Sequence, residues 1–139
     1  DFIGTHTWEE ICREWVLRAG AAATLPYLPD KVGSYWDKTV QVDVVGLNRM
    51  EKTLILGESK WSLKQVGVEV MKGLMGKTAA VVPKQGNWRV LYVGMARGGW
   101  SAAAMAAAND AAAWPQGRNW QVSGMQLVDL MRIDEDLAV

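Results

Sequence analysis

The spacing of apolar residues along the chain predicts helices in four places. Apolar residues recur at helical intervals over residues 7–19 and 66–80, so each of these segments would present one apolar face. The alanine-rich run at 100–114 favours a third helix, with Ser101 as its N-cap. The closing segment 127–137 is expected to form a short terminal helix or turn.

Short apolar runs between these helices predict strands, and the last of them is a short edge strand. The predicted strands lie near 34–37, 40–47, 54–61, 88–96 and 120–125. The first three would form an antiparallel meander, and a helical crossover would then make the fourth strand parallel to the third. The element order, α-β-β-β-α-β followed by a helix and a short strand, indicates an α/β fold with a mixed central sheet flanked by helices.

Composition narrows the class of protein. The chain has 139 residues, half of them apolar, which suits one domain with a sizeable core. The formal net charge is zero, so no overall basic field points to nucleic acid. The single cysteine, Cys12, excludes an internal disulfide and fits a reducing compartment. Without an apolar run of about 20 residues, we expect no membrane span and a cytoplasmic protein.

Two acids interrupt the apolar hairpin VQVDVVGLNRMEKTLILGESKW. If Leu47 lies opposite Leu54, then Asp43 lies opposite Glu58 on the same face of the sheet. A register one residue different would place the two acids on opposite faces. In the first register Gln41 would lie opposite the lysine that follows Glu58 by two residues.

Such a pair of acids suits a divalent cation. Two facing carboxylates repel each other, and hard oxygen ligands of this kind favour Mg²⁺ or Mn²⁺. Lys60, two residues after Glu58, would hold a phosphate or an attacking water. These residues therefore suit metal-assisted hydrolysis of a phosphodiester. The alternative is a solvated or salt-bridged rim at the end of a strand.

Four motifs together resemble the PD-(D/E)XK nuclease superfamily. The motifs are GTHTWE at 4–9, GSYWD at 33–37, QVDVV at 41–45 and GESKW at 57–61. As a set they are similar to the nuclease-like C-terminal domain of archaeal-type AAA ATPases. The likeness covers the first half of the chain, whereas the second half agrees only in element order and in a closing LVDL.

The resemblance implies a restriction-endonuclease-like core, a Mg²⁺ or Mn²⁺ cofactor and a DNA substrate. Asp43 and Glu58 would be metal ligands together with the Ser59 carbonyl, Lys60 would be catalytic, and Glu9 would complete the site. Residues 1–139 would form a single domain, cut from the C-terminal part of a longer ATPase. The chain begins with aspartate rather than methionine, which also suggests a fragment.

The geometry of the first helix agrees with a role for Glu9. At about 100° per residue, Glu9 lies roughly 90° from the centre of the apolar face, so it would lean towards the sheet edge. Glu10 points towards solvent and, with Thr7, matches a capping box. The alternative for Glu9 is a flank glutamate that is favoured by the positive end of the helix.

Other residues are weaker candidates. Gln41 stands where members of the resembling family often carry glutamate, and Gln65 would contact the phosphate backbone unless it is merely solvated. His6 is expected in the turn before the first helix, and Cys12 in the core. GMARGGW at 94–100 lacks the P-loop spacing and predicts a turn.

The cations of the chain do not form a recognisable DNA-binding track in the sequence. Six cations look scattered rather than gathered into a DNA track: Lys64, Lys72, Lys77, Lys84, Arg89 and Arg97. A second hypothesis is therefore a catalytically silent tail of an ATPase that binds nucleic acid or docks a protein. A homodimer built on exposed tryptophans is a third hypothesis, compatible with either of the others.

Overall fold

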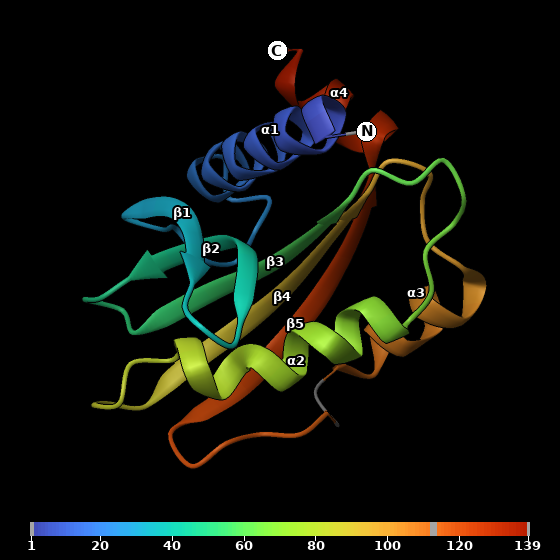
Figure 1. Cartoon of the computed structure of the whole chain (residues 1–139). Coiled ribbons are helices and arrows are strands. Elements are labelled where there is room, and N and C mark those ends of the chain that lie inside the picture. The colour runs from blue at the N-terminus through green and yellow to red at the C-terminus, as the bar shows by residue number, and fades with distance from the viewer. Residues whose placement is uncertain (1, 112–113, 139) are drawn as a thin grey trace.

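A five-stranded sheet forms the centre of the molecule, with helices on both of its faces (Figure 1). The computed structural model describes residues 2–111 and 114–138. The strands follow one another across the sheet in chain order, from β1 to β5. The elements are α1 (Phe2–Ala21), β1 (Lys31–Trp36), β2 (Gln41–Asn48), β3 (Thr53–Lys60), α2 (Glu69–Val81), β4 (Trp88–Ala96), α3 (Ala102–Asn109), β5 (Trp120–Asp129) and α4 (Leu130–Leu137).

The sheet is mixed, and the α/β class predicted from the sequence is confirmed. β1, β2 and β3 form the antiparallel meander, and Leu47 pairs with Leu54 as predicted. β4 and β5 then run parallel to β3. The carboxyl ends of β3, β4 and β5 therefore meet at one edge of the sheet, where parallel sheets commonly place functional groups.

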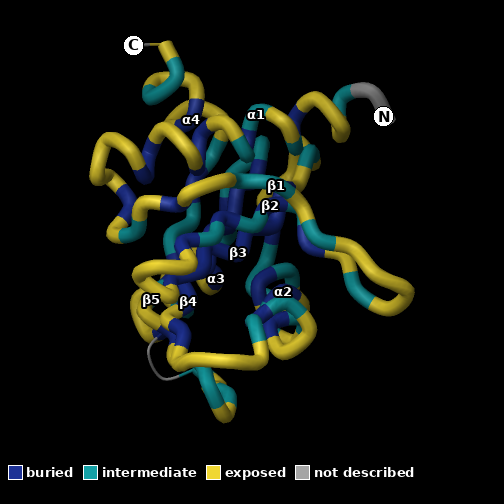
Figure 2. The backbone as a smooth tube through the Cα atoms, turned by 90° about the vertical axis from the view of Figure 1, so that its left-hand side faces the viewer, coloured by how far each residue is buried: buried dark blue, intermediate teal, exposed yellow. Residues whose placement is uncertain are grey.

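Two apolar cores lie on the two faces of the sheet. α1 and α4 pack on one face, where Trp8, Trp15 and Ile133 meet Ile55 and Val93. α2 and α3 pack on the other face, in a core that includes Met71, Leu74, Ala104, Leu54, Leu56 and Tyr92. Figure 2 shows the buried residues concentrated along the central strands and the inward sides of the helices. Because β3 and β4 are covered on both faces, nearly every residue of each strand is buried, and the sequence of β4 is almost continuously apolar.

The first helix begins earlier than the sequence pattern predicts. α1 already includes His6 and Thr7, so the predicted entry turn and the capping box are both wrong. Glu10 instead faces His6 one turn away, with Nε2 and Oε1 at 3.2 Å. The extra turn packs by tertiary contact, because Gly4 lies so close to the Trp61 indole that a Cβ would collide with it.

Several other boundaries differ from the prediction. β1 takes in residues 31–33 from the expected loop, and β5 continues to Asp129, well beyond the expected edge strand. The segment before α2 is extended, since Val66 forms an isolated bridge with Trp100. α3 is shorter than expected but begins as predicted, with Ser101 Oγ accepting a hydrogen bond from the Ala104 amide. The predicted end of this helix includes residues 112–113, which lie outside the described part of the chain.

Across the described residues, no helix has the length and apolar character needed to cross a membrane.

Candidate functional site

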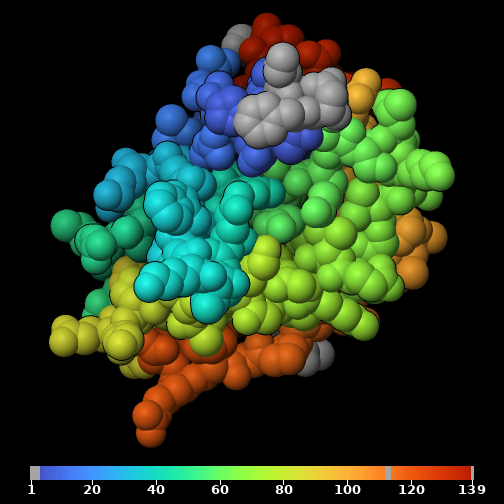
Figure 3. Space-filling view, in the orientation of Figure 1, coloured from blue at the N-terminus to red at the C-terminus, as the bar shows by residue number. Residues whose placement is uncertain are grey.

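A cavity of about 450 Å³ lies where β3 ends, between α1 and the start of β2. On the outer surface, the segment after β3, the β1–β2 region and α2 adjoin one another below α1 (Figure 3). Most of the residues predicted to form the site line this one cavity. Its lining consists of Thr5, Glu9, Gln41, Asp43, Glu58, Ser59, Lys60, Trp61 and Ser62.

A β-bulge determines how Asp43 enters the cavity. Gly33 pairs with Val45 and Tyr35 with Val42, so β2 has two residues where β1 has one. On a regular strand, Val42 and Val44 would point to the same face of the sheet. Here Val42 packs in the core beside α2 and Val44 in the core beside α1, so the alternation of side chains is broken between them. The bulge therefore changes the direction of the side chain between them, that of Asp43.

The prediction that Asp43 and Glu58 face each other directly is therefore wrong. The paired ladder of β2 and β3 ends at Val44 and Gly57, before either acid. Asp43 turns towards the α1 side, where its charge acts on Glu9 and Cys12. Glu58 turns towards α2. The two acids meet only at the strand ends, and each is positioned by a different layer of the fold.

Hydrogen bonds from β3 and α1 fix Asp43. The Ser59 amide and the Ser59 hydroxyl both donate to Asp43 Oδ2, each at 3.1 Å. The Arg13 guanidinium donates to the Asp43 backbone carbonyl at 3.0 Å. Ser59 therefore orients the carboxylate of Asp43, a role separate from the carbonyl ligand predicted for it.

Glu58 is buried next to a cation that the sequence did not single out. Glu58 is only 9% exposed, and its Oε1 lies 3.3 Å from the Nζ of Lys77 on α2. Lys77 also donates to the Gln41 carbonyl at 2.7 Å. Burial raises the pKa of Glu58 and the nearby charge of Asp43 raises it further, while Lys77 and then Lys60 act in the opposite direction.

Glu9 reaches the same cavity from α1, as the helix geometry predicts. Burial raises the pKa of Glu9, and the charge of Asp43 adds to that effect. Within residues 2–111 and 114–138, no three Asp, Glu, His or Cys side chains lie close enough together to hold a metal ion as they stand, and this includes Glu9, Asp43 and Glu58. The proposed ligand role of Glu9 therefore stays a prediction.

The donors present fit a hard divalent cation. Among the described residues, Glu58 Oε2 is a buried oxygen without a hydrogen-bond partner, and a bound cation would satisfy it. Both hydrogen bonds to the Asp43 carboxylate go to Oδ2. Two carboxylates, with the Ser59 carbonyl and water or phosphate oxygens, form the oxygen-rich set that Mg²⁺ and Mn²⁺ prefer.

Lys60 and Trp61 form the outer wall of the cavity. Lys60 is exposed, and its backbone carbonyl accepts a hydrogen bond of 2.9 Å from the Arg97 amide. Trp61 packs on Trp8 with ring centroids 5.6 Å apart. The Arg97 guanidinium lies over the Trp61 ring, with its Cζ 3.9 Å from the ring centre.

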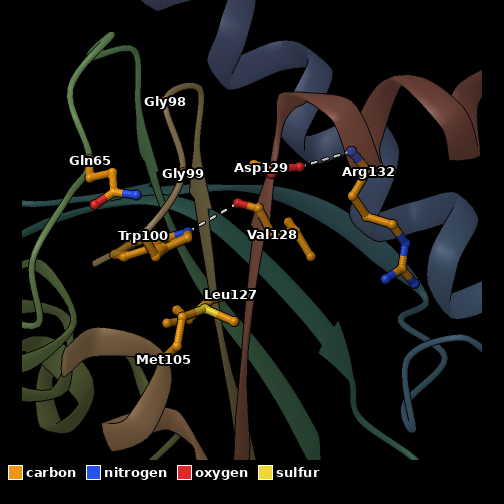
Figure 4. Close-up of a pocket in the computed structure, with 9 residues that line it drawn as sticks. All are labelled: Gln65, Gly98, Gly99, Trp100, Met105, Leu127, Val128, Asp129 and Arg132. Atoms are coloured by element: carbon orange, nitrogen blue, oxygen red, sulfur yellow. Dashed lines mark hydrogen bonds between the residues drawn. The ribbon is translucent and has the colours of Figure 1, made fainter. Parts of the chain in front are cut away.

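Gln65 is separated from this cavity. It lines a neighbouring pocket of about 420 Å³ at the carboxyl ends of β4 and β5 (Figure 4). The polar groups there serve the fold, since the Trp100 indole donates to the Val128 carbonyl at 3.0 Å and Asp129 caps α4. The structure thus gives Gln65 no contact with the acids, and its predicted role in substrate binding stays untested.

Sequence reasoning missed Lys77 and Arg97, which it treated as scattered surface cations. The position of Lys77 held a signal, because it lies one residue before the inward-facing Thr78 and three after the inward-facing Leu74. The sequence around Arg97 gave no signal of its contact, since its neighbour Trp61 comes from a distant segment. Cys12 is buried as predicted, and burial raises the pKa of its thiol far above the usual range.

Comparison with known proteins identifies a family but no activity. No curated protein and no solved structure matches the chain. The family model described as archaeal and bacterial proteins of unknown function, DUF234, matches residues 1–71. This match spans α1 to the start of α2 and includes every acid of the cavity, whereas Lys77 and Arg97 lie beyond it. Because the match covers half of the sequence, the chain belongs to the DUF234 family.

Proposed function

We propose that this domain hydrolyses phosphodiester bonds of DNA with the help of Mg²⁺ or Mn²⁺. The observation that carries the proposal is the convergence of Glu9, Asp43, Glu58 and Lys60 on one cavity at the end of β3. Glu9 comes from α1 and the other three from the β2–β3 hairpin, so the fold brings two separate segments together. A cluster of acids with raised pKa values beside a lysine is characteristic of sites that bind metal or transfer protons.

The resemblance to PD-(D/E)XK nucleases supports the same reaction class. QVDVV and GESKW carry that resemblance, and they supply Asp43, Glu58 and Lys60. A nuclease domain at the C-terminal end of an AAA ATPase would place the ATPase region among its partners. DNA and that ATPase region are both part of the proposal.

Each residue has a distinct role in the proposed reaction. Asp43 and Glu58, with the Ser59 carbonyl, would hold the metal ion, which when bound activates water and stabilises charge on the phosphoryl group. The two hydrogen bonds from Ser59 keep Asp43 in one orientation. Lys60 projects from the end of β3 and would hold the attacking water or a phosphate oxygen.

Calorimetric titration of Mn²⁺ combined with a cleavage assay tests the proposal. Asp43→Asn keeps the size of the side chain but removes its charge, so we expect both metal binding and cleavage to be lost. Lys60→Ala should still bind Mn²⁺ but lose cleavage, because the lysine acts on substrate. Branched, single-stranded and duplex DNA would all be offered as substrates.

Two matched variants separate specific effects from general ones. Glu51→Gln removes an exposed acid from the β2–β3 turn, and Lys64→Ala removes an exposed lysine from the loop after β3. Both should bind metal and cleave as the wild type does. Cleavage that survives in Asp43→Asn and Lys60→Ala would refute the proposed reaction.

A second candidate function is a catalytically silent tail that binds nucleic acid or docks a protein. The contact of Lys77 with Glu58 favours it, because an ammonium group already neutralises an acid that the nuclease would use for metal. Such a tail has no chemical need for a metal ion. Absence of Mn²⁺ binding by the wild-type protein, together with intact DNA or protein binding, would select this function.

A further inference from the structure

An exposed tryptophan stands beside the cavity. Trp36, at the end of β1, is 77% exposed, and it is the only one of the eight tryptophans in the exposed class. It pairs directly with Gln41, which lines the cavity. Directly paired residues of antiparallel strands point to the same side of a sheet, with Cβ atoms about 5 Å apart. The Trp36 indole therefore adjoins the rim of the cavity at Gln41.

The position of Trp36 is set by the local structure. Beyond the bulge in β2, the end of the β1–β2 hairpin approaches α2, where Lys77 binds the Gln41 carbonyl (Figure 1). Asp37 closes the turn by accepting hydrogen bonds from the Thr39 and Val40 amides at 2.7 and 2.8 Å. A rigid turn thus holds a large flat apolar ring in solvent, where it contributes nothing to either core.

An arginine is held against an aromatic ring in the wall of the cavity. The Arg97 guanidinium stacks on Trp61, which is part of the cavity wall. Its backbone is tied to β3 through the Lys60 carbonyl, and Gly98 passes so close to the Leu63 carbonyl that a side chain would collide. Within the described part of the chain, the guanidinium makes no hydrogen bond or ion pair. Its donors are therefore positioned and available to an anion.

Each of these two groups adjoins a residue that lines the cavity, whose acids are proposed to act on a phosphodiester. A flat ring suits a nucleobase, because every base has a π-face that can stack on it. A fixed guanidinium suits a phosphate, which it can bind in a bidentate manner. Lys60, which is exposed and lines the cavity, adds a second positive charge. Ring, cations and acids thus match the successive parts of a nucleotide strand.

We propose that the site takes an unpaired nucleic-acid strand, with a base stacked on Trp36 and a backbone phosphate bound by Arg97. The inference rests on the proposed function and specifies its substrate class. In a duplex both faces of each internal base are covered by neighbouring bases, so the exposed ring would have no partner there. An unpaired strand leaves its bases open for stacking.

Binding measured without cleavage tests the inference. Fluorescence anisotropy in EDTA would compare a labelled dT oligonucleotide with a duplex of equal length. Trp36→Leu should weaken binding of the single strand about fivefold or more, the effect of losing one stacked base. Trp36→Phe should retain most of the affinity, because it keeps an aromatic face. Met50→Ala removes an exposed side chain from the β2–β3 turn and should change nothing.

Salt dependence gives a second readout, which a merely structural role would not change. Arg97→Gln should weaken binding and reduce the slope of log affinity against log salt by about 0.7, the value for one lost phosphate contact on a single strand. Equal binding of duplex and single strand, or equal effects of Trp36→Leu and Met50→Ala, would overturn the inference. An unchanged salt slope in Arg97→Gln would overturn its phosphate arm.

Failure of this inference is distinguishable from failure of the proposed function. Loss of single-strand binding in Trp36→Leu, with no cleavage by the wild-type protein, would support the binding mode and reject the hydrolysis. Cleavage that depends on Asp43 but is indifferent to Trp36 and Arg97 would keep the hydrolysis and reject the binding mode.

Discussion

Replacing Glu58 by glutamine should stabilise the protein at neutral pH in the absence of metal. The raised pKa of Glu58 means that its surroundings disfavour the carboxylate: burial and the charge of Asp43 together outweigh the attraction of Lys77 and Lys60. Glutamine has nearly the same size and shape but no charge, so Glu58→Gln removes the penalty and keeps the packing. The wild-type residue would therefore be retained at a cost in stability.

The size of the effect follows from the link between pKa and free energy. Each unit by which folding raises a pKa corresponds to about 1.4 kcal/mol of destabilisation once the group is ionised. The glutamine still leaves a polar group in a site that is 9% exposed, which offsets part of the gain. We expect the free energy of unfolding to rise by about 1 kcal/mol, a typical value for a favourable single substitution.

The effect should depend on pH in a defined direction. The pKa of Glu58 in the folded protein lies above its ordinary value of 4.5. Below that ordinary value the group is protonated in both states, so the carboxylate imposes no penalty. Above the folded-state pKa the penalty is complete. The advantage of Glu58→Gln should therefore be larger at pH 7 than at pH 4.5, and it should shrink as the pH falls through the raised pKa towards 4.5.

Urea unfolding followed by tryptophan fluorescence measures this effect. Wild type, Glu58→Gln and the surface control Glu51→Gln would be compared at pH 7 and pH 4.5 in EDTA. A Glu58→Gln protein that is less stable than wild type at pH 7 would refute the reasoning. It would mean that the contact with Lys77 outweighs burial and the repulsion from Asp43.

Adding metal should reverse the order of stability. A ligand that binds only the folded state stabilises it by about 2.7 kcal/mol at a concentration of 100 Kd. The wild-type protein should gain this stabilisation of its folded state in Mn²⁺. Glu58→Gln has lost a charged ligand and should be stabilised far less. Equal stabilisation of both proteins would remove Glu58 from the metal site.

Two further substitutions test contacts that support the site and the helical layer. Lys77→Met should leave Glu58 without its counter-ion. We expect the free energy of unfolding in EDTA to fall by about 1–2 kcal/mol, and Mn²⁺ binding measured by calorimetry to become tighter. Weaker Mn²⁺ binding would contradict the idea that Lys77 competes with metal. Trp15→Phe removes the 2.8 Å indole hydrogen bond to Asp136 and part of a ring buried in the core beside α1. We expect a cost of about 2 kcal/mol at pH 7, of which about 1 kcal/mol comes from the hydrogen bond to a half-exposed, solvent-screened carboxylate. That hydrogen bond lowers the pKa of Asp136, so its contribution should be lost as the pH falls through the lowered pKa, and a difference that instead grows in acid would count against it.

The central strands were predictable because burial on both faces leaves an unmistakable pattern. β4 runs from Trp88 to Ala96 as predicted, and the polar turn fixes the register of β2 and β3. The ends of the fold were less predictable, because tertiary contacts decide them. The first turn of α1 depends on the fit of Gly4 against Trp61, and the polar alternation of β5 conceals a long parallel strand.

The candidate site was predictable in its residues but not in its geometry. Asp43, Glu58 and Lys60 were identifiable because polar groups are out of place at the end of an apolar hairpin. Simple alternation then put the two acids on one face, which the bulge in β2 prevents. A bulge adds one residue without a sequence signal strong enough to recognise, yet it reverses the direction of every side chain on one side of it.

The bulge also explains why the second half of the chain matters to acids that all lie in the first half. With Asp43 turned towards α1, Ser59 and Arg13 can hold it through contacts within residues 1–71. Glu58 faces α2 instead, where it forms an ion pair with Lys77, beyond the range of the family match. Relatives that share the first half should thus keep the acids in place. The residue at the position of Lys77 should modulate the pKa of Glu58, which burial and Asp43 raise, and with it the ease of metal binding.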